Sequence, residues 1–187
     1  TTKDPGTSAE ERPRVVLLSR TGAAAPSFKG VEAALAEAAA AHGGEVACVA
    51  CDVGDEAALA LALSNFRHVS GVVHAAGVLA DGAVADESLE RLRAVTRPKV
   101  RPALVLSSTY EDAPLFWLFS SVTALCGNAG QVHYGAANGA LDAVARGHAT
   151  ALSIQWGPWA ERGMAAKLRD KLERRSVWRP LSDAAAF

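Results

Sequence analysis

Short apolar runs alternate with longer alanine-rich segments along most of the chain, and this alternation restricts the fold more than any other feature. The short runs have the length and β-branched content of buried strands, and helical spacing follows most of them. Strands are predicted at residues 14–18, 45–51, 69–74, 115–120 and 151–156, and helices at 30–42, 55–65, 87–106 and 132–146. Repeated β-α units predict an α/β fold, a doubly wound parallel sheet of the Rossmann-like type with right-handed crossovers.

Local signals mark several boundaries of these elements. Gly43 and Gly44 supply a left-handed stop for the first helix, and Asp55 is placed to cap the second. Pro98 is expected to interrupt the long helix at 87–106.

Composition excludes several classes of protein. The chain has 187 residues, of which 50% are hydrophobic, so one domain with a substantial core is expected. Its formal net charge is -1 and its basic residues form no long block, which argues against a nucleic-acid binder. No apolar run approaches the roughly 18 residues of a membrane span, and the first residues are polar, unlike a secretory signal. We therefore expect a soluble protein of the cytoplasm.

The cysteines at positions 48, 51 and 126 are too few to suggest a disulfide framework. Cys48 and Cys51 have the spacing of a redox motif, but they lie in a predicted strand, where residues three apart point to opposite faces. Buried, inert thiols are expected in place of a metal or redox site.

The stretch from residue 115 to residue 147 gathers polar groups in a pattern that suggests a site. Ser120 and Ser121 end a predicted strand, at the edge where open parallel sheets bind ligands. Tyr134 and Asn138 follow on a predicted helix, and because they are four residues apart they share one face. Their hydroxyl, phenol and amide groups could converge on one polar atom. Taken singly, each also has an ordinary structural interpretation, as a buried tyrosine, a strand-end cap or a turn-facing amide.

The order Ser121, then Tyr134, then Asn138, with Lys99 upstream, resembles the active-site signature of the ketoreductase domains of modular polyketide synthases. These domains are a branch of the short-chain dehydrogenase/reductase superfamily. In most of that superfamily a lysine stands four residues after the tyrosine, whereas in this branch the lysine and asparagine places are exchanged, as here. The phrases at 74–79, 119–121, 130–131 and 155–159 agree with the same branch, and the resemblance runs from about residue 15 to 181.

The resemblance implies NADPH-dependent reduction of a β-ketoacyl thioester carried on an acyl carrier protein, beside the other domains of a synthase. Tyr134 would donate the proton, and a cation is needed beside it because a free phenol titrates near pH ~10. Lys99 would be that cation and would also hold the nicotinamide ribose. Ser121 would polarise the substrate carbonyl, and Asn138 would align the lysine or a water molecule.

The resemblance also implies a set of cofactor contacts at the strand ends. Arg20 follows the first strand and matches the family's Ser-Arg pair; its guanidinium suits the 2′-phosphate of NADPH, which favours NADPH over NADH. Small side chains after the third strand would let the backbone approach the ribose. The full set is Ser19, Arg20, Asp52, Val53, Ala75, Ala76, Gly77, Lys99, Gly157 and Pro158.

A short motif bears on the stereochemistry of the reduced product. Leu79, Ala80 and Asp81 resemble the Leu-Asp-Asp motif of B-type ketoreductases, which form the D-configured hydroxyl. The tryptophan of A-type enzymes is replaced by Cys126, so a B-type reductase is expected, with Leu79 and Asp81 as stereocontrol residues. The chain departs from the B-type pattern at Ala129 and His133, which stand where proline and asparagine are often found.

Three segments are expected along the chain. Residues 1–13 are a polar lead-in, residues 14–181 form the catalytic domain, and residues 182–187 begin a C-terminal segment. Within the catalytic domain, the charged segment 161–175 corresponds to the family's mobile lid, although an ordinary surface helix fits equally well. The family's first strand and Gly-rich phosphate loop have no counterpart before residue 14, so an incomplete Rossmann fold cut from a longer polypeptide is expected. A silent structural domain and a stand-alone dehydrogenase are the alternatives.

Overall fold

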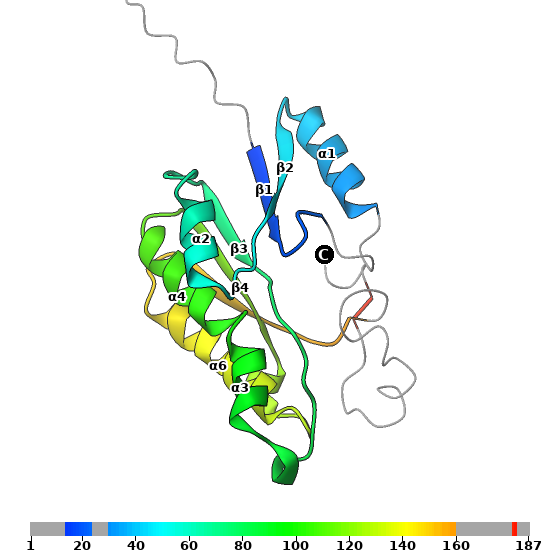
Figure 1. Cartoon of the computed structure of the whole chain (residues 1–187). Helices are drawn as coiled ribbons and strands as arrows, with labels where there is room; N and C mark the ends of the chain where they lie inside the picture. Colours follow the sequence, from blue (N-terminus) through cyan, green and yellow to red (C-terminus); the bar gives the residue numbers. More distant parts are fainter. Residues whose placement is uncertain (1–13, 24–29, 160–180, 183–187) are drawn as a thin grey trace, which may run out of the picture. The chain divides into compact units, whose positions relative to one another are not determined.

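A computed structural model describes residues 14–23, 30–159 and 181–182 (Figure 1). The chain divides into two compact units, Thr1–Cys51 and Asp52–Phe187. The predicted lead-in and the segment 161–175 lie outside the described residues. Strands and helices alternate in both units as the sequence predicts, and every strand pairing among the described residues is parallel.

Within residues 14–23 and 30–51, the first unit contains a two-stranded parallel sheet and one helix. Strand β1 (Arg14–Ser19) pairs with β2 (Glu45–Ala50) over their full lengths. Helix α1 (Val31–Ala41) lies between them in the sequence and packs on β2. Helix α1 ends at the predicted glycine stop, because Gly43 is left-handed with φ 71° and the Gly44 N–H donates back to a carbonyl in the last turn at 2.8 Å.

The second unit is built on a three-stranded parallel sheet in the order β3-β4-β5. Its strands are β3 (Gly71–His74), β4 (Leu115–Ser121) and β5 (Ala151–Trp156). Because all three run in the same direction, their carboxyl ends meet at one edge of the sheet. This is the edge at which open α/β sheets bind ligands.

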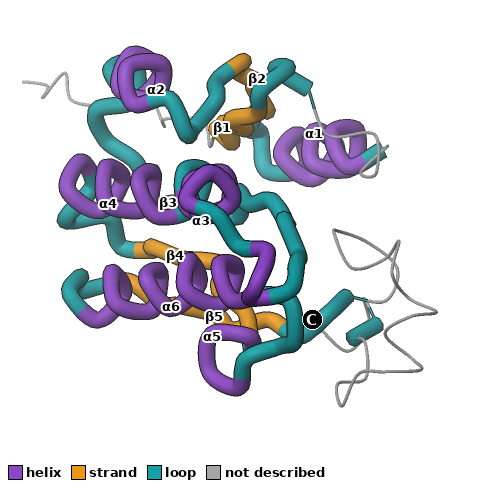
Figure 2. Tube along the Cα trace, turned by 60° about the horizontal axis from the view of Figure 1, so that its bottom comes forward, coloured by secondary structure: helices purple, strands orange, loops and turns teal. Residues whose placement is uncertain are grey.

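Several helices accompany this sheet in the described part of the second unit. They are α2 (Glu56–Leu63), α3 (Leu89–Thr96), α4 (Val100–Thr109) and α6 (Val132–Arg146), with a short α5 (Thr123–Cys126) and a 3-10 turn, η2 (Val84–Asp86). Figures 1 and 2 show α3, α4 and α6 together on the same side of β3 and β4. No helix among the described residues combines the length and the hydropathy that crossing a bilayer requires.

The long helix predicted at 87–106 is two helices. Ser88 caps α3 through its side chain, which accepts from the Arg91 N–H at 3.2 Å. The break falls at Pro98 and Lys99, as predicted, because proline has no N–H to continue the helical hydrogen bonds. Lys99 is the N-cap residue of α4, which places its side chain at the break between the two helices.

The core lies between β4 and α6. Phe116 and Leu118 of β4 and Leu141 of α6 are fully buried, and the two elements pack against each other. The opposite face of the sheet is different. Val73, Trp117 and Leu152 pair across the three strands in one register, and they remain 54%, 39% and 52% exposed. We call these three residues the apolar row.

The expectation of buried thiols is wrong for two of the cysteines. Cys51 is buried, but Cys48 and Cys126 are exposed. Cys48 points from the face of β2 opposite to Ala47 and Val49, so strand alternation turns it to solvent. Cys126 ends the short helix α5, none of whose residues is buried.

Candidate active site

The carboxyl ends of β3, β4 and β5 bring together the segments that carry the sequence motifs. Ser121 is the last residue of β4, and the Val122 N–H after it donates to the Trp156 carbonyl at the end of β5 at 3.0 Å. Residues 75–77 follow β3, and Gly157 and Pro158 follow β5. The structure therefore shows these residues of the second unit at the strand ends, as predicted.

Helix α6 presents Tyr134 and Asn138 on one face, as their spacing predicts. The Asn138 amide donates to the Tyr134 carbonyl at 2.8 Å, which fixes the amide within the helix. The Ser120 hydroxyl donates to the Asn138 carbonyl at 3.2 Å and ties this turn of α6 to β4. Asn138 is fully buried, so its side chain faces the interior of the site.

Lys99 reaches the same place from the break between α3 and α4. Its ammonium group donates to the Phe119 carbonyl at 2.9 Å and lies 5.6 Å from the centroid of the Tyr134 ring. Only 3% of the residue is exposed. Burial lowers the pKa of Lys99 to about 8, and the negative charge of Asp142 opposes this decrease.

Two residues at the end of β3 shape the surroundings of Lys99. A Cβ atom on Gly77 would lie 2.8 Å from the Lys99 Cε, so a side chain at this position would displace the lysine. The imidazole Nε2 of His74 lies 2.9 Å from the Lys99 carbonyl and holds its backbone. From the sequence, the small residue at position 77 was expected to leave room for the cofactor ribose. In the structure, the absence of a side chain at Gly77 also leaves room for the methylene chain of Lys99.

The phenol of Tyr134 is half-buried, and its pKa is raised. Burial is the main cause of this increase, and the negative charge of Asp81 adds to it. Hydrogen bonding with Asn138 and, to a smaller extent, with Ser121 lowers the pKa and so opposes the increase. Tyr134 therefore carries its proton at neutral pH, and in this form it can act as a proton donor.

Two hydrogen-bonding groups near Tyr134 are left with capacity for a ligand. The Ser121 hydroxyl oxygen accepts from the Thr123 N–H at 3.2 Å, which leaves its own proton available for donation. The Asn138 Oδ1 is buried and has no hydrogen-bond partner among the described residues. Because an unsatisfied buried acceptor is costly, this oxygen is suited to a donor such as an ammonium group or a water molecule.

The stereocontrol residues predicted from the sequence lie in a loop that is fastened to the turn before α6. The Asp81 carboxylate accepts from the Gln131 side-chain amide at 3.0 Å, and its carbonyl accepts from Arg91 at 2.8 Å. The Gly82 N–H donates to the Gly130 carbonyl at 2.9 Å. Asp81 is exposed, and Leu79 is half-buried in the same loop.

The residues predicted to bind the cofactor divide between the two units. Ser19 and Arg20 end β1 in the first unit, where Arg20 is exposed and the Ser19 hydroxyl donates to the Ala23 carbonyl at 2.7 Å. The others belong to the second unit. There the Asp52 carboxylate accepts from the Gly54 N–H at 3.0 Å and lies 3.5 Å from Arg97.

The other cofactor residues of the second unit flank the strand ends. Val53, Ala76, Gly157 and Pro158 are half-buried, whereas Ala75 is exposed. The Pro158 carbonyl accepts from the Leu181 N–H at 2.7 Å, so the segment after β5 is held by a distant part of the chain.

Residues 9–161 match the model of the KR domain, which covers most of the chain. The chain belongs to the KR domain family. This confirms the resemblance to polyketide synthase ketoreductases inferred from the motifs, together with the Rossmann-like α/β fold of the short-chain dehydrogenase/reductase type.

Individual KR relatives agree with this assignment. The polyketide synthase GfsB of Streptomyces halstedii is 45% identical over 163 residues, covering 82% of this chain but 3% of that synthase. The mycoketide-CoA synthase of Mycobacterium tuberculosis is 42% identical, and the match covers 78% of this chain and 4% of that synthase. The chain thus spans a small fraction of the curated relatives that it matches.

Solved KR structures share the fold. A ketoreductase from the first module of phoslactomycin biosynthesis in Streptomyces sp. HK803 is 41% identical with a TM-score of 0.77, and the match covers 92% of this chain and 41% of that one. The first ketoreductase of the tylosin synthase is 40% identical with a TM-score of 0.75, covering 92% and 39%.

Sequence reasoning missed three residues that shape this KR site. His74 was used only as part of a motif, Gln131 only as part of a phrase, and Asp142 was not considered. A usable signal existed for Asp142, which lies eight residues after Tyr134 and four after Asn138, on the same helical face. No such signal pointed to the backbone contact of His74 with Lys99, because that contact depends on the packing of β3 beside the break between two helices.

Acidification is expected to destabilise the second unit through His74. Burial lowers the pKa of His74 from 6.5 to about 4, so between these values the unfolded chain binds a proton that the folded chain does not. The stability that the neutral imidazole provides is present above pH 6.5 and is lost as the pH falls toward 4, by up to about 3 kcal/mol. Urea unfolding of the wild type and of His74→Gln across this range measures the effect.

The matched control for this measurement is His68→Gln, which removes an exposed histidine from the same unit. The control should keep the wild-type slope of stability against pH, whereas His74→Gln should flatten it. Equal slopes in all three proteins would contradict the assignment to His74.

Proposed function

We propose that this chain carries the catalytic part of an NADPH-dependent β-ketoacyl reductase, which reduces a β-ketoacyl thioester on an acyl carrier protein to the β-hydroxyacyl thioester. One observation carries the proposal: a buried ammonium group lies 5.6 Å from the ring of a protonated tyrosine at the carboxyl edge of a parallel sheet. Ser121 and Asn138 interact with the same tyrosine. Membership of the KR family supports this chemistry.

The proposed roles follow from the hydrogen-bonding capacity of each group. Ser121 donates to the substrate carbonyl oxygen and polarises the carbon. Tyr134 transfers its hydroxyl proton to that oxygen as negative charge develops on it, and general acids of this kind contribute about 10²–10⁴-fold to rates. The Lys99 ammonium stabilises the resulting phenolate, and Asn138 Oδ1 accepts from the ammonium or from a water molecule between them.

Taken by itself, each unit contains residues suited to part of a nicotinamide dinucleotide. The cofactor, when bound, supplies the hydride that adds to the carbonyl carbon. Arg20 is exposed at the end of β1 and offers a bidentate donor for a 2′-phosphate, with Ser19 beside it. Small residues after β3 leave the backbone accessible to a ribose, to which Lys99 is a further donor. We assign the adenine to Asp52 and Val53 and the nicotinamide side to Gly157 and Pro158.

The substrate and partner assignments draw on the relatives. GfsB is a polyketide synthase and the Mycobacterium tuberculosis relative is a mycoketide-CoA synthase, so an acyl chain presented by an acyl carrier protein of a synthase is the proposed substrate. The other domains of such a synthase are the proposed partners.

We assign B-type stereochemistry to the site from Asp81. Its carboxylate is held by Gln131, three residues before Tyr134, so the loop that carries Leu79 and Asp81 borders the start of α6. His133, which replaces the asparagine often found in B-type enzymes, lies 2.7 Å from the Glu87 carboxylate and ties a second point of the same loop to the helix.

The function is tested by incubating the polypeptide with NADPH or NADH and a β-ketoacyl N-acetylcysteamine thioester. We expect NADPH to be consumed, with a preference over NADH of roughly 10-fold or more if Arg20 binds the 2′-phosphate. Chiral chromatography should show the D-configured hydroxyl.

Each part of this test has its own contrary outcome. A rate no higher than that of Tyr134→Phe would identify a silent structural domain. Equal use of NADH would remove the role of Arg20, and an L-configured product would show that Asp81 does not set the configuration.

A further inference from the structure

Asp142 extends the functional face of α6 beyond the residues identified from the sequence. It follows Tyr134 by eight residues and Asn138 by four, so the three side chains project from the same side of the helix at successive turns. The Ser120 hydroxyl of β4 donates to the Asn138 backbone carbonyl, so this turn of α6 lies against β4. Asp142 is half-buried one turn further along.

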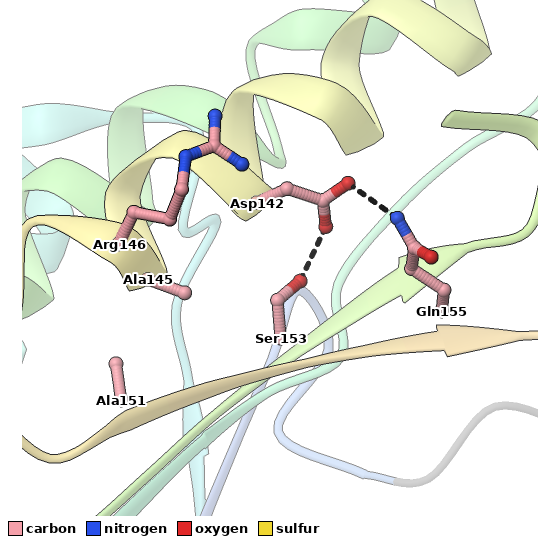
Figure 3. A pocket seen from close by; sticks show the side chains of 6 residues that line it. All are labelled: Asp142, Ala145, Arg146, Ala151, Ser153 and Gln155. Carbon is pink, nitrogen blue, oxygen red and sulfur yellow. Dashed lines mark hydrogen bonds between the residues drawn. The ribbon is translucent and has the colours of Figure 1, made fainter. Parts of the chain in front are cut away.

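The carboxylate of Asp142 is fixed by strand β5. The Ser153 hydroxyl donates to one carboxylate oxygen, and the Gln155 amide donates to the other at 2.8 Å (Figure 3). The three residues line a pocket of about 370 Å³ together with Arg146, whose side chain is exposed. Because both donors are neutral, they hold the carboxylate in place without cancelling its charge.

Strand register relates the donors of this carboxylate to the acceptor of the Lys99 ammonium. Ser153 and Gln155 flank Ile154, and Ile154 pairs with Phe119 in the neighbouring strand β4. Phe119 is the residue whose carbonyl accepts from the Lys99 ammonium. Adjacent strands are separated by about 4.8 Å, so the two donors of the carboxylate lie on either side of the residue that pairs with Phe119, one strand away from the acceptor of the ammonium.

We propose that Asp142 is a positioning residue for ketone reduction, whose carboxylate is the counter-charge of the Lys99 ammonium. A buried ammonium is unstable without a compensating negative charge, and the Phe119 carbonyl supplies only a dipole. Asp142 does not contact the substrate in this proposal; it keeps Lys99 charged, so that Lys99 can stabilise the phenolate of Tyr134. The inference rests on the proposed function for its catalytic consequence, but the pairing of charges can be measured separately.

Other ionisable groups near Lys99 do not replace Asp142. His74 of β3 faces the lysine backbone, and its pKa is lowered to about 4, so it is neutral at the pH of interest. Tyr134 of α6 is protonated and neutral, and Asp81 of the loop before η2 acts on Tyr134. Two neighbouring cations are paired elsewhere, Arg97 with Asp52 and Arg101 with Glu56. Arg146 of α6 is exposed and lines the same pocket as Asp142.

The pairing is tested by following the titration of Lys99 directly. Protein with ¹³Cε-labelled lysine gives one NMR signal for each of Lys3, Lys29, Lys99, Lys167 and Lys171, and the Lys99 signal is identified by its loss in Lys99→Met. In the wild type we expect a midpoint near pH 8. Asp142→Asn should move this midpoint about one pH unit toward acid, and Asp142→Glu should restore most of it.

The control is Asp112→Asn, which removes the same charge from an exposed turn at the opposite end of β4. It should leave the Lys99 midpoint within a few tenths of a pH unit of the wild type, because exposed distant charges are screened. If Asp142→Asn does not fold, Asp142→Ser provides a second neutral variant. An unchanged midpoint in the neutral variant, or an equal change in Asp112→Asn, would overturn the proposal.

Activity provides the second arm of the experiment. If Lys99 must be charged, the decline of the reduction rate on the alkaline side should move toward acid in Asp142→Asn by the same amount as the NMR midpoint. A shifted midpoint with an unshifted rate profile would overturn the role of Asp142 in the reaction. If the polypeptide reduces no ketone at all, the proposed function fails while the NMR result still decides whether the charges are paired.

Discussion

Replacing Tyr134 with phenylalanine is expected to lower the rate of ketone reduction by about 10²–10⁴-fold, the usual contribution of a general acid. The ring remains, so the packing of α6 is kept, and the loss is confined to the proton and to the hydrogen bonds of the hydroxyl with Ser121 and Asn138. The measurement is the rate of NADPH consumption with saturating β-ketoacyl thioester. Cofactor affinity should change little, because the phenol itself is assigned to the substrate.

The chain offers a matched control in its other tyrosine. Tyr110 is also buried, and its hydroxyl donates to the Phe66 carbonyl at 2.7 Å, away from the carboxyl edge of the sheet. Tyr110→Phe should lose about 1 kcal/mol of stability but retain the wild-type rate. Similar rates in Tyr134→Phe and the wild type would end the assignment of Tyr134 as proton donor.

Replacing Lys99 with methionine should stabilise the fold while abolishing most of the activity. Burial lowers the pKa of Lys99 from 10.5 to about 8, which means that keeping this side chain charged at neutral pH opposes folding. Lys99→Met leaves the Asp142 carboxylate without its counter-charge, but this carboxylate is only half-buried and keeps the hydrogen bonds from Ser153 and Gln155. Allowing for this loss and for the hydrogen bond to the Phe119 carbonyl, we expect Lys99→Met to be about 1–3 kcal/mol more stable at pH 7. Thermal or urea unfolding measures the difference.

The sign of the pH dependence makes this prediction specific. Between pH 8 and 10.5 the unfolded chain holds the lysine proton more tightly than the folded chain, so wild-type stability rises with pH in that window. Lys99→Met lacks this rise, and its advantage should shrink as the pH increases above 8. The control is Arg101→Met, which removes a cation whose side chain is 57% exposed. We expect this change to alter the free energy of unfolding by less than about 1 kcal/mol. A Lys99→Met protein less stable than the wild type would contradict the prediction.

The fold could be predicted from the sequence because its signals are local. The strands at 14–18, 115–120 and 151–156 were placed to within one residue, and the Asp55 cap was confirmed by its hydrogen bonds to Ala57 and Ala58 at 3.0 Å. The 3-10 turn η2 and the helix α5 were not predicted. Both are short and have no buried residues, so no periodic pattern of apolar residues marks them.

The site was predictable only where residue order carried the information. Helical spacing was sufficient to place Tyr134 and Asn138 on one face, whereas Lys99 was placed beside them through the family motif. The charge environment could not be predicted. The Lys99 ammonium is held by a backbone carbonyl, a group present at every residue, and no sequence pattern shows which carbonyl a bend between two helices will bring it to.

The apolar row of Val73, Trp117 and Leu152 affects how the isolated polypeptide should be handled. Large uncovered hydrocarbon surfaces tend to bind one another, and sulfate and phosphate strengthen this tendency because they are excluded from protein surfaces. Preparations purified by salting-out will therefore favour association of copies through the sheet. Buffers of low ionic strength without these anions are the better choice for rate measurements, since the reacting groups lie at an edge of the same sheet.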